Sequence, residues 1–159
     1  MVNVDGDDEL IGKNVLKVFN AAYQKLKAGV VYSNFYFYEQ GISVMQGFTS
    51  EYEPFEKKEN LYRGISLKFS HLMSFRAELL LKIKEKDLKD ENGNFYRSAY
   101  NLVLYFPLME SACERVFKIE GMHYLYNTNT GLNDDLMNRE AQIAIDEKVR
   151  SSVRYSCDL

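Results

Sequence analysis

The sequence predicts a single α/β domain over residues 1–159, with a mixed sheet flanked by helices. Segments rich in β-branched and aromatic residues, as in strands, alternate with segments whose apolar residues recur every three or four positions, as in amphipathic helices. The 159 residues are enough for one hydrophobic core and too few for two ordinary domains. A composition of 46% hydrophobic and 27% charged residues is typical of a folded chain.

Two strands are predicted to flank a helix in the first part of the chain. Residues 2–4 resemble the tail of a strand, and residues 11–26 follow a helical period that Gly29 ends. Residues 30–41, VVYSNFYFYEQG, are dense in β-branched and aromatic side chains, which predicts a buried strand. Residues 42–64 contain a proline and a charged run, and we expect a weak strand followed by a loop.

The second half is predicted to contain a helix, a turn, a buried segment, a strand pair and a last helix. A helix begins near Ser74 in FSHLMSFRAELLLKI, and Asn92-Gly93 marks an exposed turn. Residues 101–116 are too continuously apolar for a surface helix, so this segment is largely buried. VFKIEGMHYLYNTN alternates as two strands around Gly121. The last helix is expected after an N-cap at Asn133, with one apolar stripe: Met137, Ala141, Ile145, Val149 and Val153.

Charge and composition exclude several classes of protein. The net charge of −3, with lysines and arginines scattered along the chain, gives no electrostatic footprint for nucleic acid or an anionic membrane. No apolar run approaches the ~18 residues that a membrane span needs. The acidic amino terminus lacks the basic and apolar regions of a signal peptide. Cys113 and Cys157 have no Cys or His neighbours at metal-ligand spacing, and we expect a buried thiol and a tail thiol. Because free thiols and the absence of a signal peptide are typical of a reducing compartment, we expect a cytoplasmic chain by default.

Three carboxylates follow the first strand within four residues, in the stretch VDGDDEL. Asp5 and Asp7 lie two residues apart at the end of the strand, so both can face one divalent cation, and Gly6 lets the backbone approach closely. Mg²⁺ and Mn²⁺ prefer such hard oxygen ligands. The alternative is an acidic turn that caps the following helix, with Asp7 or Asp8 as the N-cap.

Six segments in this order carry a resemblance: DGDDELIG, VVYSNF, FSHLMSFR, DENGNF, NLVLYFPLMESACERV and YLYNTNTGLNDD. Together they resemble the carboxy-terminal half of a family 2 glycosyltransferase domain with a GT-A, Rossmann-like fold. The resemblance implies transfer of a sugar from a nucleotide-diphosphate donor with inversion, assisted by Mg²⁺ or Mn²⁺. It also implies that the upstream strands, which hold the nucleotide in the family, are missing from this chain.

The resemblance assigns roles to individual residues. Asp5 and Asp7 match the family's metal-binding Asp-x-Asp motif, at the end of a central strand, and Asp8 matches a frequent third acid close to substrate. His71 and Arg76 fall in the block that lies near the acceptor. A helix-capping Ser74 beside a surface histidine and arginine is the alternative for that block. We expect His123, in the predicted strand MHYLY, to be structural.

One position departs from the family pattern. An aspartate commonly precedes the run L-x-L-x-F-P-x-x-E, where it is the candidate general base, and this chain has Asn101 there. An amide cannot take a proton from an acceptor hydroxyl, and loss of a general base costs about 10² to 10⁴ in rate. Glu110 matches the retained glutamate, as an acceptor contact or a structural residue. Asp90 and Glu91 could substitute only if their loop folded inward, so we expect the isolated chain to be inactive.

Three hypotheses follow from the sequence. The chain is an active sugar transferase with an unusual base, a degenerate transferase-like module with a structural or binding role in a larger assembly, or a fragment of a longer protein. A nucleotide-diphosphate sugar and its acceptor are the partners if the chain is active. A central strand without its neighbours leaves unpaired amides, so a protein partner or a homodimer that covers the amino-terminal strand is also expected.

Overall fold

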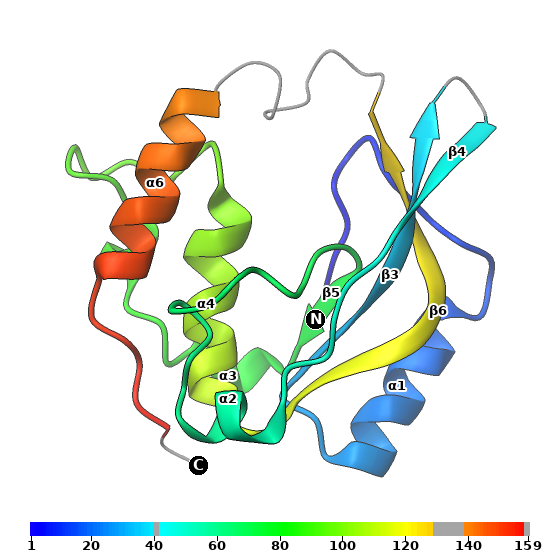
Figure 1. The fold of residues 1–159 in the computed structure, drawn as a ribbon, viewed down its shortest axis with the longest axis horizontal. Coiled ribbons are helices and arrows are strands. Elements are labelled where there is room, and N and C mark those ends of the chain that lie inside the picture. Colours follow the sequence, from blue (N-terminus) through cyan, green and yellow to red (C-terminus); the bar gives the residue numbers. More distant parts are fainter. Residues whose placement is uncertain (40–41, 129–138, 158–159) are drawn as a thin grey trace.

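The computed structural model describes residues 1–39, 42–128 and 139–157. It confirms the α/β class: a mixed six-stranded sheet has helices on both faces (Figure 1). Five strands lie in the order β1-β5-β3-β6-β2, and β4 pairs with the far half of β3. Their bounds are β1 Val2–Asn3, β2 Glu9–Leu10, β3 Val30–Glu39, β4 Ile42–Gly47, β5 Met73–Phe75 and β6 Val116–Asn127.

The long strand β3 organises the sheet, as its aromatic and β-branched sequence predicted. It pairs in parallel with β6 on one side and antiparallel with β5 and β4 on the other. Val30 and Tyr32 point into one hydrophobic cluster, whereas Val31 and Phe35 point into the other. This alternation follows the two-residue period of a strand, so β3 separates two cores.

The sheet is strongly curled, because β1 and β2 lie at its opposite edges yet are joined by a short connection (Figure 1). Five neighbouring strands of a flat sheet span about 19 Å at ~4.8 Å per step. The chain from Asn3 to Glu9 reaches about 20 Å only when fully extended. It contains a turn, in which the Asp8 N–H donates to the Asp5 carbonyl at 3.1 Å, so the sheet has to curve to bring its edges together.

Helices cover the two faces unequally (Figure 1). The helix α1, Val15–Leu26, buries Val15, Phe19 and Ala22 against one face, at the spacing of an amphipathic helix. The helix α4, Tyr100–Ala112, lies on the other face and is buried almost all round, as the apolar run predicted; Pro107 lies inside it. The other elements on that face are the equally long α6, Arg139–Ser151, and three short ones: α2 Pro54–Lys58, α3 Ala77–Leu80 and the 3₁₀ turn Glu85–Leu88.

The prediction of a helix beginning near Ser74 is wrong. Met73, Ser74 and Phe75 form β5, in which Ser74 pairs with Val2 on one side and with Val31 on the other. Only the four residues of α3 that follow are helical. Pairing between distant strands overrides the local helical pattern here, because the sheet satisfies the backbone of these buried residues on both sides.

The predicted limits of two other elements change. Glu9 and Leu10 form β2, so the first helix starts at Val15 and not near residue 11, and neither Asp7 nor Asp8 caps it; Asn14 is at the N-cap position. The segment around Gly121 is one continuous strand, β6, and not a pair. Its register to β3 shifts between the pairs Tyr32–Lys118 and Asn34–Met122, so the extra residues form a bulge next to Gly121.

The turn at Asn92-Gly93 is confirmed. The Asp90 carboxylate accepts the backbone N–H groups of Asn92 and Asn94, each at 2.9 Å, and Gly93 has a φ of +80°. Glu91 is exposed on this turn. The Asp90 carboxylate thus bonds to its own turn, Glu91 is exposed, and neither acid lines the cleft described below.

The last helix is confirmed over Arg139–Ser151, whereas the proposed N-cap Asn133 and the first stripe residue, Met137, lie outside the described residues. Ile145 and Val149 pack against the core as predicted. Val153 lies beyond the helix and is exposed.

The expectation of two free thiols is wrong, because Cys113 and Cys157 form a disulfide with their Cα atoms 5.4 Å apart. It joins the end of α4 to the segment after α6. Disulfides are typical of oxidising compartments, so the bond gives no support to the cytoplasmic expectation, which stays a prediction. Of the helices in the described ranges, none has the length and apolar character needed to cross a bilayer.

Candidate functional site

A cleft of about 800 Å³ opens at the end of the sheet where β1 finishes and β6 ends. The loop after β1 forms one wall, and the first turn of α4 and part of α6 form others. The side chains that line it come from five regions: Asn3, Val4, Asp5, Gly6 and Asp7; Leu67, Phe69, Ser70, His71 and Met73; Ala99, Tyr100, Asn101, Leu102 and Tyr105; Tyr126 and Asn127; and Gln142, Ile143 and Asp146.

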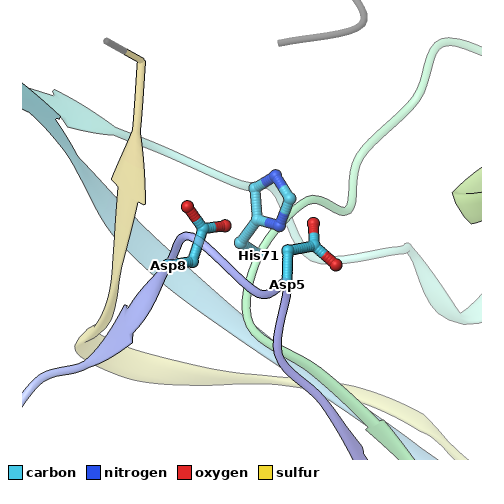
Figure 2. Close-up of side chains that lie close together, drawn as sticks. All are labelled: Asp5, Asp8 and His71. Atoms are coloured by element: carbon cyan, nitrogen blue, oxygen red, sulfur yellow. The ribbon is translucent and has the colours of Figure 1, made fainter. Parts of the chain in front are cut away.

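Three potential metal ligands meet beside this cleft: Asp5, Asp8 and His71. One ligand atom from each lies within 4.8 Å of the other two, and all three side chains are half-buried. In Figure 2 the carboxylates of Asp5 and Asp8 flank the His71 ring. Two come from the loop between β1 and β2, and the histidine precedes β5, so the group joins segments that are more than sixty residues apart.

The turn in the loop decides which acids meet. A continued strand would have placed Asp5 and Asp7 on one side. Instead, the hydrogen bond from the Asp8 N–H to the Asp5 carbonyl closes a β-turn, which brings residues three apart together. Asp7 lines the cleft but is not part of the group of three. The structure therefore brings Asp8, not Asp7, beside Asp5.

The Asp8 carboxylate is held at one oxygen and open at the other. Its Oδ1 accepts the backbone N–H of Asn127 at 2.8 Å. Its Oδ2 is buried and has no partner within ordinary hydrogen-bond geometry. Burial raises the pKa of Asp8 to about 6, against the opposing effects of the nearby Tyr124 hydroxyl and the Asn127 N–H. A buried carboxylate oxygen without a donor is a place where a cation would be favourable.

Aromatic rings fix the orientation of His71. The imidazole stacks on Tyr124, with ring centroids 5.0 Å apart and an interplanar angle of 4°, and on Tyr126, at 4.6 Å and 15°. The edge of Phe35 meets it at 5.4 Å. These contacts limit the ring to one plane, in which it faces the two carboxylates (Figure 2).

The Asp5 carboxylate accepts hydrogen bonds from two neighbours. The Tyr100 hydroxyl donates to its Oδ1, and the Asn3 side-chain amide donates to the same atom at 3.4 Å. Burial is the largest cause that raises the pKa of Tyr100, and the bond to Asp5 adds to it. The loop and the start of α4 are thus joined directly through Asp5.

The remaining predicted residues fall in different places. Asn101 lines the cleft from the first turn of α4, and its side-chain oxygen is buried without a hydrogen-bond partner. Glu110 is fully buried further along α4, where it pairs with Arg63, and it does not line the cleft. Arg76 also lies away from the cleft lining: its Nε donates to the Ala28 carbonyl at 2.7 Å, and its guanidinium lies over the Tyr23 ring.

The second histidine has the packed environment expected of a structural residue. His123 is buried, and its ring meets the Phe19 ring edge-on at 5.6 Å. Burial lowers its pKa, so the neutral form is favoured.

Several cleft residues were not foreseen. Tyr100, Tyr105 and Tyr126 contribute rings, and Gln142 and Asp146 of α6 contribute polar side chains. Tyr105 and Tyr126 lie in segments that carried the resemblance, NLVLYFPLMESACERV and YLYNTNTGLNDD. The others reach the cleft through the packing of α4 and α6, which no local pattern reports.

Comparison with known proteins leaves the sequence without an assignment. No protein-family profile matches the chain, and no curated protein is significantly similar to it.

Proposed function

We propose that this chain is a glycosyltransferase-like domain whose acidic loop binds a divalent cation, beside a cleft where the diphosphate of a nucleotide sugar docks. The meeting of Asp5, Asp8 and His71 within 4.8 Å is the observation that carries the proposal. Spacing along the sequence does not produce such a group by itself, because the histidine comes from a different strand region.

The donor set suits a cation of intermediate hardness. Two carboxylates suit Mg²⁺ and Mn²⁺, whereas an imidazole suits transition metals. The buried, unpartnered Oδ2 of Asp8 is the further sign that the residues fit a cation. We therefore favour Mn²⁺ over Mg²⁺. When bound, it would neutralise negative charge that develops on a diphosphate leaving group.

The placement of the quoted segments supports the same lineage. The DGDD loop, His71 of the FSHLMSFR block, the start of NLVLYFP and the end of the YLYN block all border one cleft. The strand β1 pairs only with β5 among the described residues, so its other edge is open. In the proposed GT-A arrangement, further strands would pair at this open edge.

Asn101 favours the second hypothesis, a module that has lost the transfer step. Asn101 lines the cleft, and by the resemblance it stands where the family has its candidate base; an amide does not accept a proton at neutral pH. The described acids Asp90 and Glu91 lie outside the lining of the cleft. We accordingly propose that the chain binds metal and nucleotide diphosphate without efficient turnover.

A titration of the full chain with Mn²⁺, in the absence and presence of uridine diphosphate, tests the proposal. We expect saturable Mn²⁺ binding that uridine diphosphate strengthens. Asp8→Asn and His71→Ala should each weaken Mn²⁺ binding by about 10-fold or more, because each removes one ligand. Glu91→Gln removes an exposed carboxylate on the distant turn and is the matched control, with unchanged affinity. Absence of saturable binding to the wild-type chain would contradict the proposal.

A partner or a second copy that covers the open edge of β1 stays a prediction. Val2 and Val4 at this edge are 37% and 41% exposed. Exposed strand edges with apolar side chains favour association. Sedimentation of the chain across a concentration series would detect self-association.

A further inference from the structure

Tyr124 of β6 contacts two members of the candidate metal group, although it was not among the expected site residues. Its side chain is buried, with 1% exposed. Its ring stacks on His71, and its hydroxyl bonds to the backbone of Asp5.

The hydroxyl holds the first acid of the loop through its backbone. It accepts the Asp5 N–H at 3.0 Å, which fixes the start of the turn that places Asp8 beside Asp5. Loss of the hydroxyl would leave the Asp5 N–H without this acceptor.

The aromatic ring of Tyr124 orients the His71 side chain. Tyr124 and His71 stack with an interplanar angle of 4°, which defines the plane in which the imidazole nitrogens lie. Tyr126 stacks on the same imidazole at 4.6 Å, so the ring of Tyr124 is one of two supports.

The backbone of Tyr124 is well held. It pairs with Leu10 of β2 on one side and with Phe35 of β3 on the other, so it lies in the interior of the sheet. A residue whose backbone is paired on both sides can position neighbouring side chains, because its own movement is small. Through Tyr124 the sheet therefore supports Asp5 and His71.

We propose that Tyr124 is a positioning residue for a divalent cation site, holding the Asp5 backbone through its hydroxyl and setting the plane of His71 through its ring. This inference rests on the proposed function, since it concerns the same cation site. It goes beyond the resemblance, which assigned no role to this position. Outer groups that orient metal ligands typically contribute 10- to 100-fold to metal affinity.

Tyr124→Phe tests the hydroxyl, because the variant keeps the ring that stacks on His71. We expect Mn²⁺ affinity, measured by isothermal titration or by the electron paramagnetic resonance signal of free Mn²⁺, to fall about 10-fold. Tyr32→Phe is the matched control. Tyr32 is fully buried and its hydroxyl donates to the Ser50 carbonyl at 2.6 Å, away from the cleft, so this variant loses a comparable hydrogen bond without touching the group.

The measurements separate positioning from simple destabilisation. Both variants should lower the melting temperature by similar amounts, and only Tyr124→Phe should weaken Mn²⁺ binding. If the wild-type chain binds Mn²⁺ and Tyr124→Phe binds it with the same affinity, the positioning role is overturned and the proposed function stands. Equal weakening in Tyr124→Phe and Tyr32→Phe would also overturn it. A wild-type chain that binds no Mn²⁺ would instead contradict the proposed function itself.

Discussion

Arg63 and Glu110 form a buried, bidentate ion pair that joins three distant parts of the chain. The Arg63 Nε lies 2.5 Å from Glu110 Oε1, and its second nitrogen contact to Oε2 is 2.8 Å. The same carboxylate accepts the Tyr155 N–H at 3.0 Å, and Arg63 also donates to the Val149 carbonyl at 2.6 Å. Burial raises the pKa of Glu110, although the Arg63 guanidinium opposes this rise. These contacts favour the structural interpretation of Glu110 over the acceptor contact.

Glu110→Ala should therefore destabilise the fold strongly. Removing one partner leaves the Arg63 charge buried and unpaired, which typically costs about 3–5 kcal/mol. The free energy of unfolding in urea measures the effect. Glu85→Ala is the control, because it breaks the exposed Glu85–Lys89 pair, and we expect no measurable change. Normal stability in Glu110→Ala would contradict the structural role.

The Cys113–Cys157 disulfide should contribute substantially to stability. It closes a segment of 44 residues, for which the chain-entropy relation gives about 4 kcal/mol. We expect reduction with dithiothreitol, or the variant Cys157→Ser, to lower the free energy of unfolding by this amount, seen as a lower midpoint of unfolding in urea. Cys157→Ser should show no further change on reduction. Two reactive thiols in the unfolded, unreduced chain would show that the bond does not form.

Gly47 should tolerate no side chain. A Cβ built there would lie 2.3 Å from the Phe35 ring, which in turn meets His71 edge-on. We expect Gly47→Ala to cost about 1–3 kcal/mol, as overpacking of a filled site does. Gly6→Ala is the matched control. A Cβ at Gly6 meets nothing within 4 Å, so the melting temperature of that variant should stay close to that of the wild type.

Mn²⁺ itself should stabilise the chain if the site is as proposed. A ligand that binds only the folded state at 100 times its dissociation constant adds about 2.7 kcal/mol. We expect a rise in the melting temperature with Mn²⁺ that disappears in Asp8→Asn. A rise of equal size in that variant would place the cation elsewhere on the molecule.

The local sequence pattern was sufficient to predict the elements that have strong sequence signals. The aromatic run of β3, the continuously apolar α4 and the Asn92-Gly93 turn lie where the sequence predicted them. Each depends on side chains that are near neighbours in sequence, so periodicity and turn chemistry suffice. The acidic loop and His71 were also recognised as candidate site residues from the sequence.

Only the tertiary structure determined which distant residues contact one another. Ser74 looked helical, yet it lies between Val2 and Val31 in the sheet. Asp7 had the spacing of a ligand beside Asp5, yet a turn between the edges of a curled sheet brings Asp8 there and places His71 beside both. The physical reason is that strand pairing, sheet curvature and ring stacking join residues far apart in the chain, and a local pattern contains no information about which distant segments will meet.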